Sequence, residues 1–398
     1  MRRTSNANGI LRPVAFEFPS RVFAGFWSKQ RMKIICHREA FLSACQLAST
    51  AVPSKDVKAV LRNIKAHADE MRCNLFATDL ELGLRLDVGG VEVIKPGKAL
   101  LPAQKIIAIL REAREDQLEI ESTSDGLTIK GKKLRFELPY EDPEQFPDVP
   151  EFGEDMWHEI RAGDLREMIR RTVFSCATES ARYTMTGVLW ELESDEARLI
   201  ATDGRRLALA QGPAKSVGGH TTGTNGPVVP SKTLGVLDRN LTDDDEIVKI
   251  KVGTNEIFFR TDCSVLYSRL IEGRYPDYRA ILPKTAAIKL TVSAGGLLSG
   301  VRQASIMSDD ETKRLNFHLE SGQITFEAQA ALGGKSKIEM AVDYDGEEIS
   351  TSFNPQFLID MLKTMPPEAE LQMELSSPGK PVLFRAGSSY LYLVMPMS

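Results

Sequence analysis

A segment repeats along this chain at a nearly constant spacing, and this repeat constrains the fold more than any other feature. Three pairs of segments carry the repeat: NLFATDL (74–80) with RLIATDG (198–204), PAQK (102–105) with PSK (230–232), and FPD (146–148) with YPD (275–277). Their offsets are 124, 127 and 129 residues. A third copy of the proline segment begins at Asn354-Pro355. A fixed period of this kind indicates tandem copies of one structural unit.

The repeat predicts three units in the 367 residues from Met32 onward, each of about 122 residues. An amphipathic helix is expected near the start of each unit, over 38–49, 164–177 and 295–308. The repeated proline segments predict a second helix, because proline suits the first helical turn. Alternating runs at 118–121, 127–130, 134–138 and 247–252 are typical of antiparallel strands. We therefore expect an α+β fold of three tandem repeats, each with two helices on a curved antiparallel sheet, and domain boundaries at 32–154, 155–283 and 284–398.

Residues 1–31 differ in composition from the rest of the chain. They carry six basic side chains against one acid, Glu17, without apolar periodicity. This composition predicts a disordered, basic N-terminal extension rather than a secretory signal, and an organellar transit peptide is a weaker interpretation. A simpler alternative is that translation begins at Met32, since MKII (32–35) opens the first convincing strand.

Charge and cysteine usage exclude several classes of protein. The net charge of −5 argues against a protein that coats nucleic acid by bulk charge. The five cysteines are odd in number and fit neither a disulfide framework nor a CxxC metal site, which indicates reduced cytosolic thiols and a cytoplasmic protein. No run approaches the roughly 20 apolar residues that a membrane span needs, so a membrane-spanning role is excluded.

The sequence contains one partial match to a nucleotide-binding motif. GLTIKGK (126–132) fits the first seven positions of a phosphate-binding loop, but Lys133 stands where serine or threonine is required. Because the stretch lies between two alternating strands, a hairpin is favoured. The five histidines are scattered without metal-ligand spacing. We expect no catalytic residues, metal or cofactor, and a nucleotide-binding enzyme whose ATP binding needs Lys132 remains the competing hypothesis.

Three further motifs carry a family resemblance: ATDGRRLA (201–208), EGRYPDY (272–278) and YLVMPM (392–397). With them, the chain from Met32 to its C-terminus resembles the bacterial sliding clamps, the beta subunits of DNA polymerase III. The resemblance implies two protomers closing head to tail into a six-domain ring, with helices lining the hole. It also implies a non-enzymatic processivity factor for DNA replication, associated with the nucleoid. The implied partners are a second copy of the chain, double-stranded DNA bound without sequence specificity, the replicative polymerase, a clamp loader and other replication and repair proteins.

Basic residues on the predicted helices are candidates for the DNA-facing surface, because a net-negative ring can still present positive charge to the phosphates in its hole. They are Lys105, Arg111, Arg114, Arg166, Arg170, Arg171, Lys232, Arg239, Arg302 and Lys363. By resemblance, Lys55 matches a loop position that contacts DNA, whereas Glu179 replaces a neutral or polar residue in the comparable loop of the second unit. Any single helix charge is equally well explained as a solvated surface residue. Reversing Lys105 and Lys232 to glutamate is expected to weaken loading.

The resemblance also places a partner groove that holds short hydrophobic peptides. The matching residues are Met185, Thr202, Gly204, Arg205, Arg206, Leu207, Pro276, Ile281, Pro381, Val382, Leu393, Met395, Pro396 and Met397. Methionines with Leu207 and Ile281 would give a deformable apolar surface that suits several partners. Alternatively, the C-terminal Met and Pro residues merely finish the last strand. Ala280 stands where the family often has a basic residue, and Ser398 ends the chain where relatives commonly add an arginine and an apolar residue.

The ring interface is expected at Phe136 and Leu138 of the first unit and at Ile306 and Met307 of the third. Edge strands must be paired or protected, and ring closure would pair them. Ordinary core packing is the alternative, above all for Ile306. Glu179, Ala280 and the short C-terminus leave open a second hypothesis, a clamp-like paralogue that keeps the partner groove but is impaired in loading.

Overall fold

The computed structural model describes residues 31–53, 58–123, 126–178, 180–222, 226–283, 285–308, 313–331 and 333–397. The expectations for the N-terminal extension up to residue 30, for Lys55 and for Glu179 lie outside these residues. Within the described part of the chain, no helix is long and apolar enough to cross a membrane.

Three units of similar make-up follow one another, each with two α-helices and antiparallel strands. The first contains β1 (Lys33–His37), α1 (Arg38–Ser49), η1 (Ala59–Arg62), β2 (Asn63–Ala68), β3 (Cys73–Thr78), β4 (Leu82–Val88), β5 (Val91–Lys95), β6 (Gly97–Pro102), α2 (Ala103–Glu112), β7 (Gln117–Ser122), β8 (Gly126–Lys130), β9 (Arg135–Pro139) and η2 (Pro143–Gln145). The second contains β10 (Trp157–Arg161), α3 (Ala162–Thr172), η3 (Val173–Ser175), η4 (Ser180–Thr186), β11 (Gly187–Leu192), β12 (Glu196–Thr202), β13 (Arg206–Pro213), β14 (Lys215–Val217), β15 (Val228–Pro230), α4 (Ser231–Asn240), β16 (Ile247–Val252), β17 (Glu256–Arg260), β18 (Ser264–Arg269) and η5 (Tyr278–Ile281). The third contains β19 (Ile288–Ser293), α5 (Ala294–Ser305), β20 (Leu315–Glu320), β21 (Gln323–Gln329), β22 (Lys335–Ala341), β23 (Ile349–Phe353), α6 (Pro355–Leu362), β24 (Glu370–Leu375), β25 (Val382–Ala386) and β26 (Tyr390–Val394). The predicted fold class, two helices on antiparallel sheet in each unit, is confirmed.

The repeated proline segments do begin helices. Pro102 and Pro230 are the residues that precede α2 and α4. In the third unit Asn354 caps α6, because its side chain accepts a hydrogen bond from the Gln356 amide at 3.0 Å, and Pro355 is the first helical residue. Only Pro355 occupies the first helical position, where the missing N–H costs nothing, and in all three units the second helix begins at or directly after the repeated proline.

Two hydrogen-bonded strand pairs join the three units. β4 of the first unit pairs antiparallel with β18 of the second, and β13 of the second pairs with β26 of the third. The first pairing completes a nine-stranded sheet in the order β14-β10-β16-β17-β18-β4-β3-β2-β6, and the second an eight-stranded sheet in the order β15-β11-β12-β13-β26-β25-β24-β19. Two smaller sheets, β5-β1-β7-β8-β9 and β22-β21-β20-β23, lie at the two ends of the chain's arc.

The repeated ATD segments form the same turn in the first and second units. The Thr78 hydroxyl donates to the Leu82 carbonyl at 2.7 Å, as Thr202 does to Arg206 at 2.7 Å. In each turn the aspartate accepts two backbone amides within 3.0 Å. The residue after that aspartate has positive φ, 79° at Leu80 and 84° at Gly204. Glycine adopts this conformation at no steric cost, whereas leucine does so only because the surrounding hydrogen bonds fix the turn.

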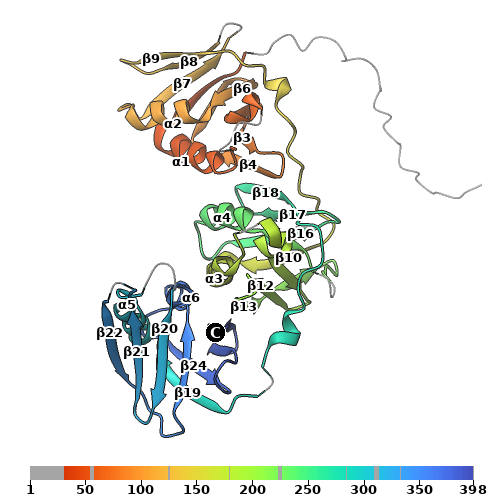
Figure 1. The fold of residues 1–398 in the computed structure, drawn as a ribbon. Helices are drawn as coiled ribbons and strands as arrows, with labels where there is room; N and C mark the ends of the chain where they lie inside the picture. Colours follow the sequence, from red (N-terminus) through yellow and green to blue (C-terminus); the bar gives the residue numbers. More distant parts are fainter. Residues whose placement is uncertain are drawn as a thin grey trace, which may run out of the picture.

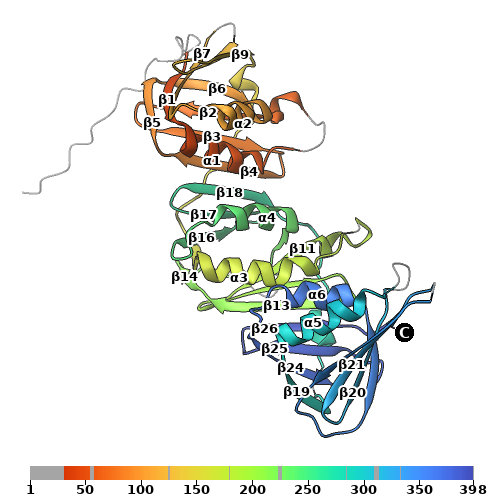
Figure 2. The ribbon, with the colours of Figure 1, turned by 90° about the vertical axis from the view of Figure 1, so that its left-hand side faces the viewer.

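The units lie along an arc, with their helices on its concave side (Figure 1). From that side, the pairs α1/α2, α3/α4 and α5/α6 cover the sheets behind them (Figure 2). Their apolar faces, such as Leu165 and Ile169 of α3, are buried against the strands, so their polar faces are left toward the inside of the arc. The fold therefore offers one continuous helical surface.

The GLTIKGK segment is a strand followed by a turn, not a phosphate-binding loop. Residues 126–130 form β8, paired with β7 and β9, and the chain continues into β9 rather than into a helix. A side chain at Gly126 would clash with the Leu138 carbonyl oxygen, so the glycine allows close approach of the neighbouring strand.

Candidate functional site

The joint between β13 and β26 brings together the central part of the predicted partner groove. Leu207 lies opposite Leu393, and Val382 of β25 lies opposite Val394. The Met395 amide donates to the Arg205 carbonyl at 2.8 Å, so the C-terminal segment stays attached beyond the last strand. Residues from two distant stretches of the chain, 205–207 and 382–395, therefore meet at this joint.

The predicted groove residues divide into a buried floor and an accessible rim. Thr202, Leu207, Val382 and Leu393 are buried, and the two leucines belong to a hydrophobic cluster with Tyr275 and Tyr278. Gly204, Arg205, Ile281 and Met395 are exposed, Ile281 and Met395 by 48% and 40%, and the others are half-buried: Met185, Arg206, Pro276, Pro381, Pro396 and Met397. The apolar contact surface is therefore supplied by the rim, whereas Leu207 supports it from below.

Arg206 fastens the second unit to the third. Its guanidinium donates to Asp203 at 3.0 Å, to Asp360 of α6 at 2.8 Å and to the Phe174 carbonyl at 2.7 Å. It also lies over the rings of Phe174 and Phe357, 5.6 and 4.5 Å from their centroids. With all these partners, Arg206 is held firmly at the joint, where its side chain also lines a cavity.

A cavity of about 350 Å³ opens beside Arg206, on the helix side of the joint. Its lining includes Asp203, Arg205, Asn354 and Phe357. Asn354 and Phe357 are not among the predicted site residues, because the Asn354-Pro355 motif by itself indicates only a helix start. The signal that could have found them is position: Asn354 caps α6 and Phe357 lies in its first turn, and this helix packs against the turn at 202–206.

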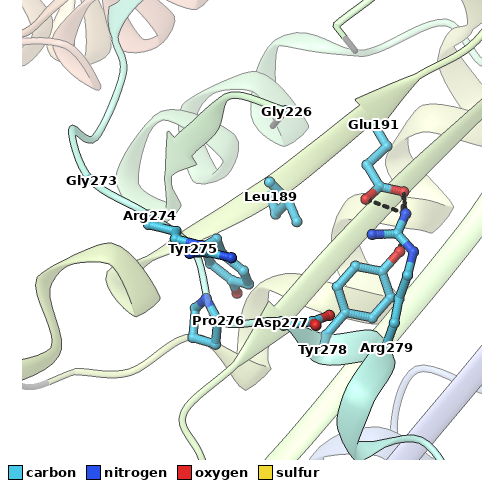
Figure 3. A pocket seen from close by; sticks show the side chains of 10 residues that line it. All are labelled: Leu189, Glu191, Gly226, Gly273, Arg274, Tyr275, Pro276, Asp277, Tyr278 and Arg279. Atoms are coloured by element: carbon cyan, nitrogen blue, oxygen red, sulfur yellow. Dashed lines mark hydrogen bonds and ion pairs between the residues drawn. The ribbon is translucent and has the colours of Figure 1, made fainter. Parts of the chain in front are cut away.

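A larger cavity of about 680 Å³ lies on the outer side of the sheet, beneath the loop that carries Pro276 (Figure 3). Its wall contains a buried carboxylate, Glu191, which accepts two hydrogen bonds from Arg279 at 2.7 Å and one from the Tyr278 hydroxyl at 3.1 Å. Burial raises the pKa of Tyr278 to about 12. Arg279 and Tyr278 both belong to η5, so Glu191 holds the short helix that ends at Ile281.

The basic candidates lie on the helices of the concave side or just beyond their ends, and they differ in their partners. Arg114 is predicted on a helix but follows α2, and Lys363 is the C-cap of α6. Arg166 pairs with Asp244, Arg170 with Asp238 at 2.9 Å, Arg171 with Glu167 at 2.6 Å, and Lys232 with Asp79 of the first unit. The remaining six are exposed, and none makes an ion pair with another residue in the described ranges: Lys105, Arg111, Arg114, Arg239, Arg302 and Lys363. The free positive charge is therefore concentrated on the first and third units.

Comparison with known proteins connects this architecture to one family. The models of the N-terminal, central and C-terminal domains of the DNA polymerase III beta subunit match residues 32–150, 159–277 and 279–398. The beta sliding clamp of Pseudomonas putida is 30% identical over 370 residues, which cover 92% of this chain and 100% of that protein. The chain belongs to the DNA polymerase III beta subunit family.

Other members of this sliding clamp family agree in sequence and in fold. The beta sliding clamp of Escherichia coli K12 is 27% identical over 368 residues, covering 92% of this chain and 100% of that protein. The crystal structure of the Pseudomonas aeruginosa sliding clamp bound to griselimycin superposes with a TM-score of 0.85 at 28% identity, over 92% of this chain and 99% of the other. The Caulobacter crescentus beta sliding clamp gives a TM-score of 0.85 at 26% identity, over 93% and 100%.

The predicted interface residues of this sliding clamp lie at the two ends of the arc. Phe136 is 40% exposed on β9, the free edge of the first small sheet, and Leu138 is half-buried on the same strand. Ile306 and Met307 follow α5 and are 74% and 37% exposed. Met307 lies against Gly334, just before β22, which is the free edge of the last small sheet.

The described residues contain no cluster of three or more histidine, cysteine or acidic side chains that could hold a metal ion. Of the cysteines, Cys36, Cys45, Cys73 and Cys176 are buried and Cys263 is exposed. Burial raises the pKa of the Cys36, Cys73 and Cys176 thiols to about 12, so these three are unreactive packing residues.

Proposed function

We propose that two copies of this sliding clamp close head to tail into a ring around duplex DNA and tether the replicative polymerase to it. The observation that carries this proposal is the arrangement of the arc, with its helices on the concave side and unpaired basic side chains on them. Loose contacts with phosphates suit a ring that slides, because base-edge hydrogen bonds would hold it at one sequence. The clamp acts without chemistry of its own, in the cytoplasm and on the nucleoid during replication.

Ring closure joins the first domain of one protomer to the third domain of the other. β9 and β22 are both edge strands with unused backbone donors and acceptors, and exposed apolar residues stand beside each of them. Pairing these edges satisfies the backbone groups and buries Phe136 and Ile306. For the domains themselves we propose the ranges 32–154, 155–283 and 284–398.

The rim around Met395 and Ile281 binds short hydrophobic segments of the polymerase, the clamp loader and other replication and repair proteins. The exposed apolar rim and the cavities on either side of the joint support this assignment. Methionine adapts its shape to different partners, which suits one groove that serves several proteins.

The test of the proposed function is retention on circular DNA. Labelled clamp, its cognate loader and ATP are incubated with nicked circular DNA, and bound clamp is measured before and after the circle is cut. A ring that encircles DNA is retained on the circle and lost on linearisation. Retention that survives cutting would contradict topological binding.

The DNA path is tested in the same assay with charge reversals. Lys105→Glu and Arg239→Glu are chosen because both side chains are exposed on inner helices and have no ion-pair partner among the described residues. Lys232 is a poorer choice, because its pair with Asp79 spans the joint between the first two domains. Reversal of Lys95 and Lys380, which lie outside the helices, is the matched control.

Two outcomes separate the proposal from its alternative. Reduced loading by the Lys105 and Arg239 variants, with the control unaffected, supports the DNA path. An intact dimer that an active loader never deposits on the circle would instead identify a clamp-like paralogue that keeps the groove but is impaired in loading.

A further inference from the structure

The second domain contains five of the ten basic candidates, as many as the other two domains together, but all of these five except Arg239 are ion-paired within the chain. Arg170 Nε lies 2.9 Å from Asp238 Oδ1, and Arg166 Nε lies 4.0 Å from the same oxygen. Asp238 is on α4 and both arginines are on α3, so one carboxylate serves two guanidinium groups from the facing helix. We propose that Asp238 weakens the hold of the central domain on DNA and thereby sets how tightly this clamp grips the duplex.

The charges around this carboxylate support the proposal. Arg166 also pairs with Asp244, and Arg171 with Glu167. The three arginines line one cavity of about 210 Å³, and Glu167 and Asp244 line the same cavity. A phosphate that approaches it meets positive and negative groups in similar number. The attraction of the cavity for DNA is therefore much smaller than its three guanidinium groups alone would produce.

The first and third domains lack this compensation. Lys105, Arg111 and Arg114 in the first domain, and Arg302 and Lys363 in the third, make no ion pair within the described ranges. In the second domain Arg239 alone among the basic candidates is unpaired there. The electrostatic attraction for DNA is consequently uneven around the ring. It is stronger at the first and third domains and weaker at the central domain.

Asp238 is suited to adjusting the affinity for DNA, because it contributes little to the stability of the fold. Its side chain is 25% exposed and that of Arg170 is 55% exposed, so water screens their attraction and the pair contributes little to stability. Replacing the carboxylate by an amide keeps its shape and a hydrogen-bond acceptor for Arg170. The positive charge that it compensates then becomes available to a phosphate.

The test compares Asp238→Asn with wild type in equilibrium binding to a short duplex at several salt concentrations. This inference rests on the proposed function, because it assumes that DNA lies against the inner helices. One additional phosphate neutralised per protomer, two per ring, makes log affinity fall more steeply with log salt, by about 1.8 in the slope. We expect several-fold tighter binding at low salt and slower diffusion of the loaded ring. Asp195→Asn is the matched control, since Asp195 is an exposed aspartate of the same domain in the β11–β12 turn.

The possible outcomes test the role of Asp238 separately from the proposed DNA path. Binding of Asp238→Asn equal to wild type, while Lys105→Glu binds less tightly, would overturn the role of Asp238 and leave the DNA path intact. Equal gains from Asp238→Asn and Asp195→Asn would reduce the effect to net charge and also overturn it. No change in any of these variants would count against the DNA path itself. Adding Arg170→Gln to Asp238→Asn should abolish the gain, and a gain that persists would show that Arg170 is not the group released.

Discussion

At the scale of single residues, the second domain contains a buried histidine pair whose protons are fixed by their partners. Val252 N–H donates to His220 Nε2 at 3.1 Å, so the proton of His220 is on Nδ1 and points to Nδ1 of His158, 2.6 Å away. His158 Nε2–H then donates to the Glu193 carbonyl at 2.6 Å. Both rings are therefore neutral, and each polar atom of the pair has one partner.

Acidification should destabilise the domain through this pair. Burial lowers the pKa of both histidines, and for His220 the neighbouring His158 and Lys251 lower it further, opposed by Asp155. The unfolded chain binds protons below about pH 6.5 more readily than the native state, so stability falls as pH drops below that value. We expect a loss on the order of 1 kcal/mol between about pH 7.5 and 5.5, measured as a lower melting temperature.

Variants separate this pair from other titrating groups. Replacing His158 and His220 together by asparagine should flatten the dependence of melting temperature on pH, whatever it does to the absolute value. His318→Asn is the control, because the His318 side chain on β20 is 42% exposed, and it should leave that dependence unchanged. An unaltered slope in the double variant would show that the pair does not control the acid sensitivity.

At the scale of elements, the short helix η5 depends on one residue of the sheet beneath it. Glu191 accepts hydrogen bonds from both Tyr278 and Arg279, and Ile281 of the groove rim follows in the same turn. Removal of these acceptors leaves the Tyr278 hydroxyl buried without its partner, which costs about 1–3 kcal/mol.

We therefore expect Glu191→Ala to weaken binding of a short hydrophobic peptide from the cognate polymerase by several-fold, as measured by fluorescence anisotropy. Equilibrium binding of the free clamp to a short duplex should change little, because the inner helices are untouched. Glu193→Ala, an exposed glutamate in the turn after the same strand, provides the comparison. Wild-type affinity in Glu191→Ala would mean that η5 keeps its position without the carboxylate.

The sequence predicted elements more reliably than it predicted the contacts between them. The helix expected at 38–49 is α1 without change, and the run at 247–252 is β16. The helix expected at 164–177 instead covers Ala162–Thr172, because β10 runs directly into it and Asp164, taken as its start, lies in its first turn. The chain then tightens into η3, which no apolar period reveals.

The contacts of the candidate groove could not be predicted from the sequence, because the groove lies at a joint between domains. Repetition within a chain locates the units, but it contains no information about which strand edges pair between them. Arg206 is expected in the groove, and it lines a cavity there, but the sequence gives no sign of its ion pair with Asp360, 154 residues away. Its neighbour Arg205 is exposed to solvent. Two adjacent arginines that look equivalent in the sequence therefore have different surroundings in the structure.

At the scale of the whole molecule, the proposed ring depends on the two ends of the arc. Phe136 and Ile306 are exposed in the single chain and become buried if the ring closes. Burial of a large apolar side chain is worth about 1.5–3 kcal/mol, so Phe136→Glu or Ile306→Glu should weaken the dimer by tenfold or more in sedimentation equilibrium. Ile94→Glu is the control, because Ile94 is 48% exposed on β5, at the opposite edge of the same small sheet as β9. Equal dimer affinity in all three variants would place the interface elsewhere.

The strand pairs between the domains also determine how the molecule can deform. Five residue pairs of β4 and β18, and five of β13 and β26, carry backbone hydrogen bonding across the two internal joints. Bending the arc outward at either joint would strain several of these bonds at once. The three domains of one protomer are therefore expected to move as a single rigid body. In the proposed ring, each seam between protomers would have only the β9–β22 strand pair and a few apolar side chains. A duplex that enters such a ring sideways would therefore pass through a seam, and force applied to the ring would be relieved there first.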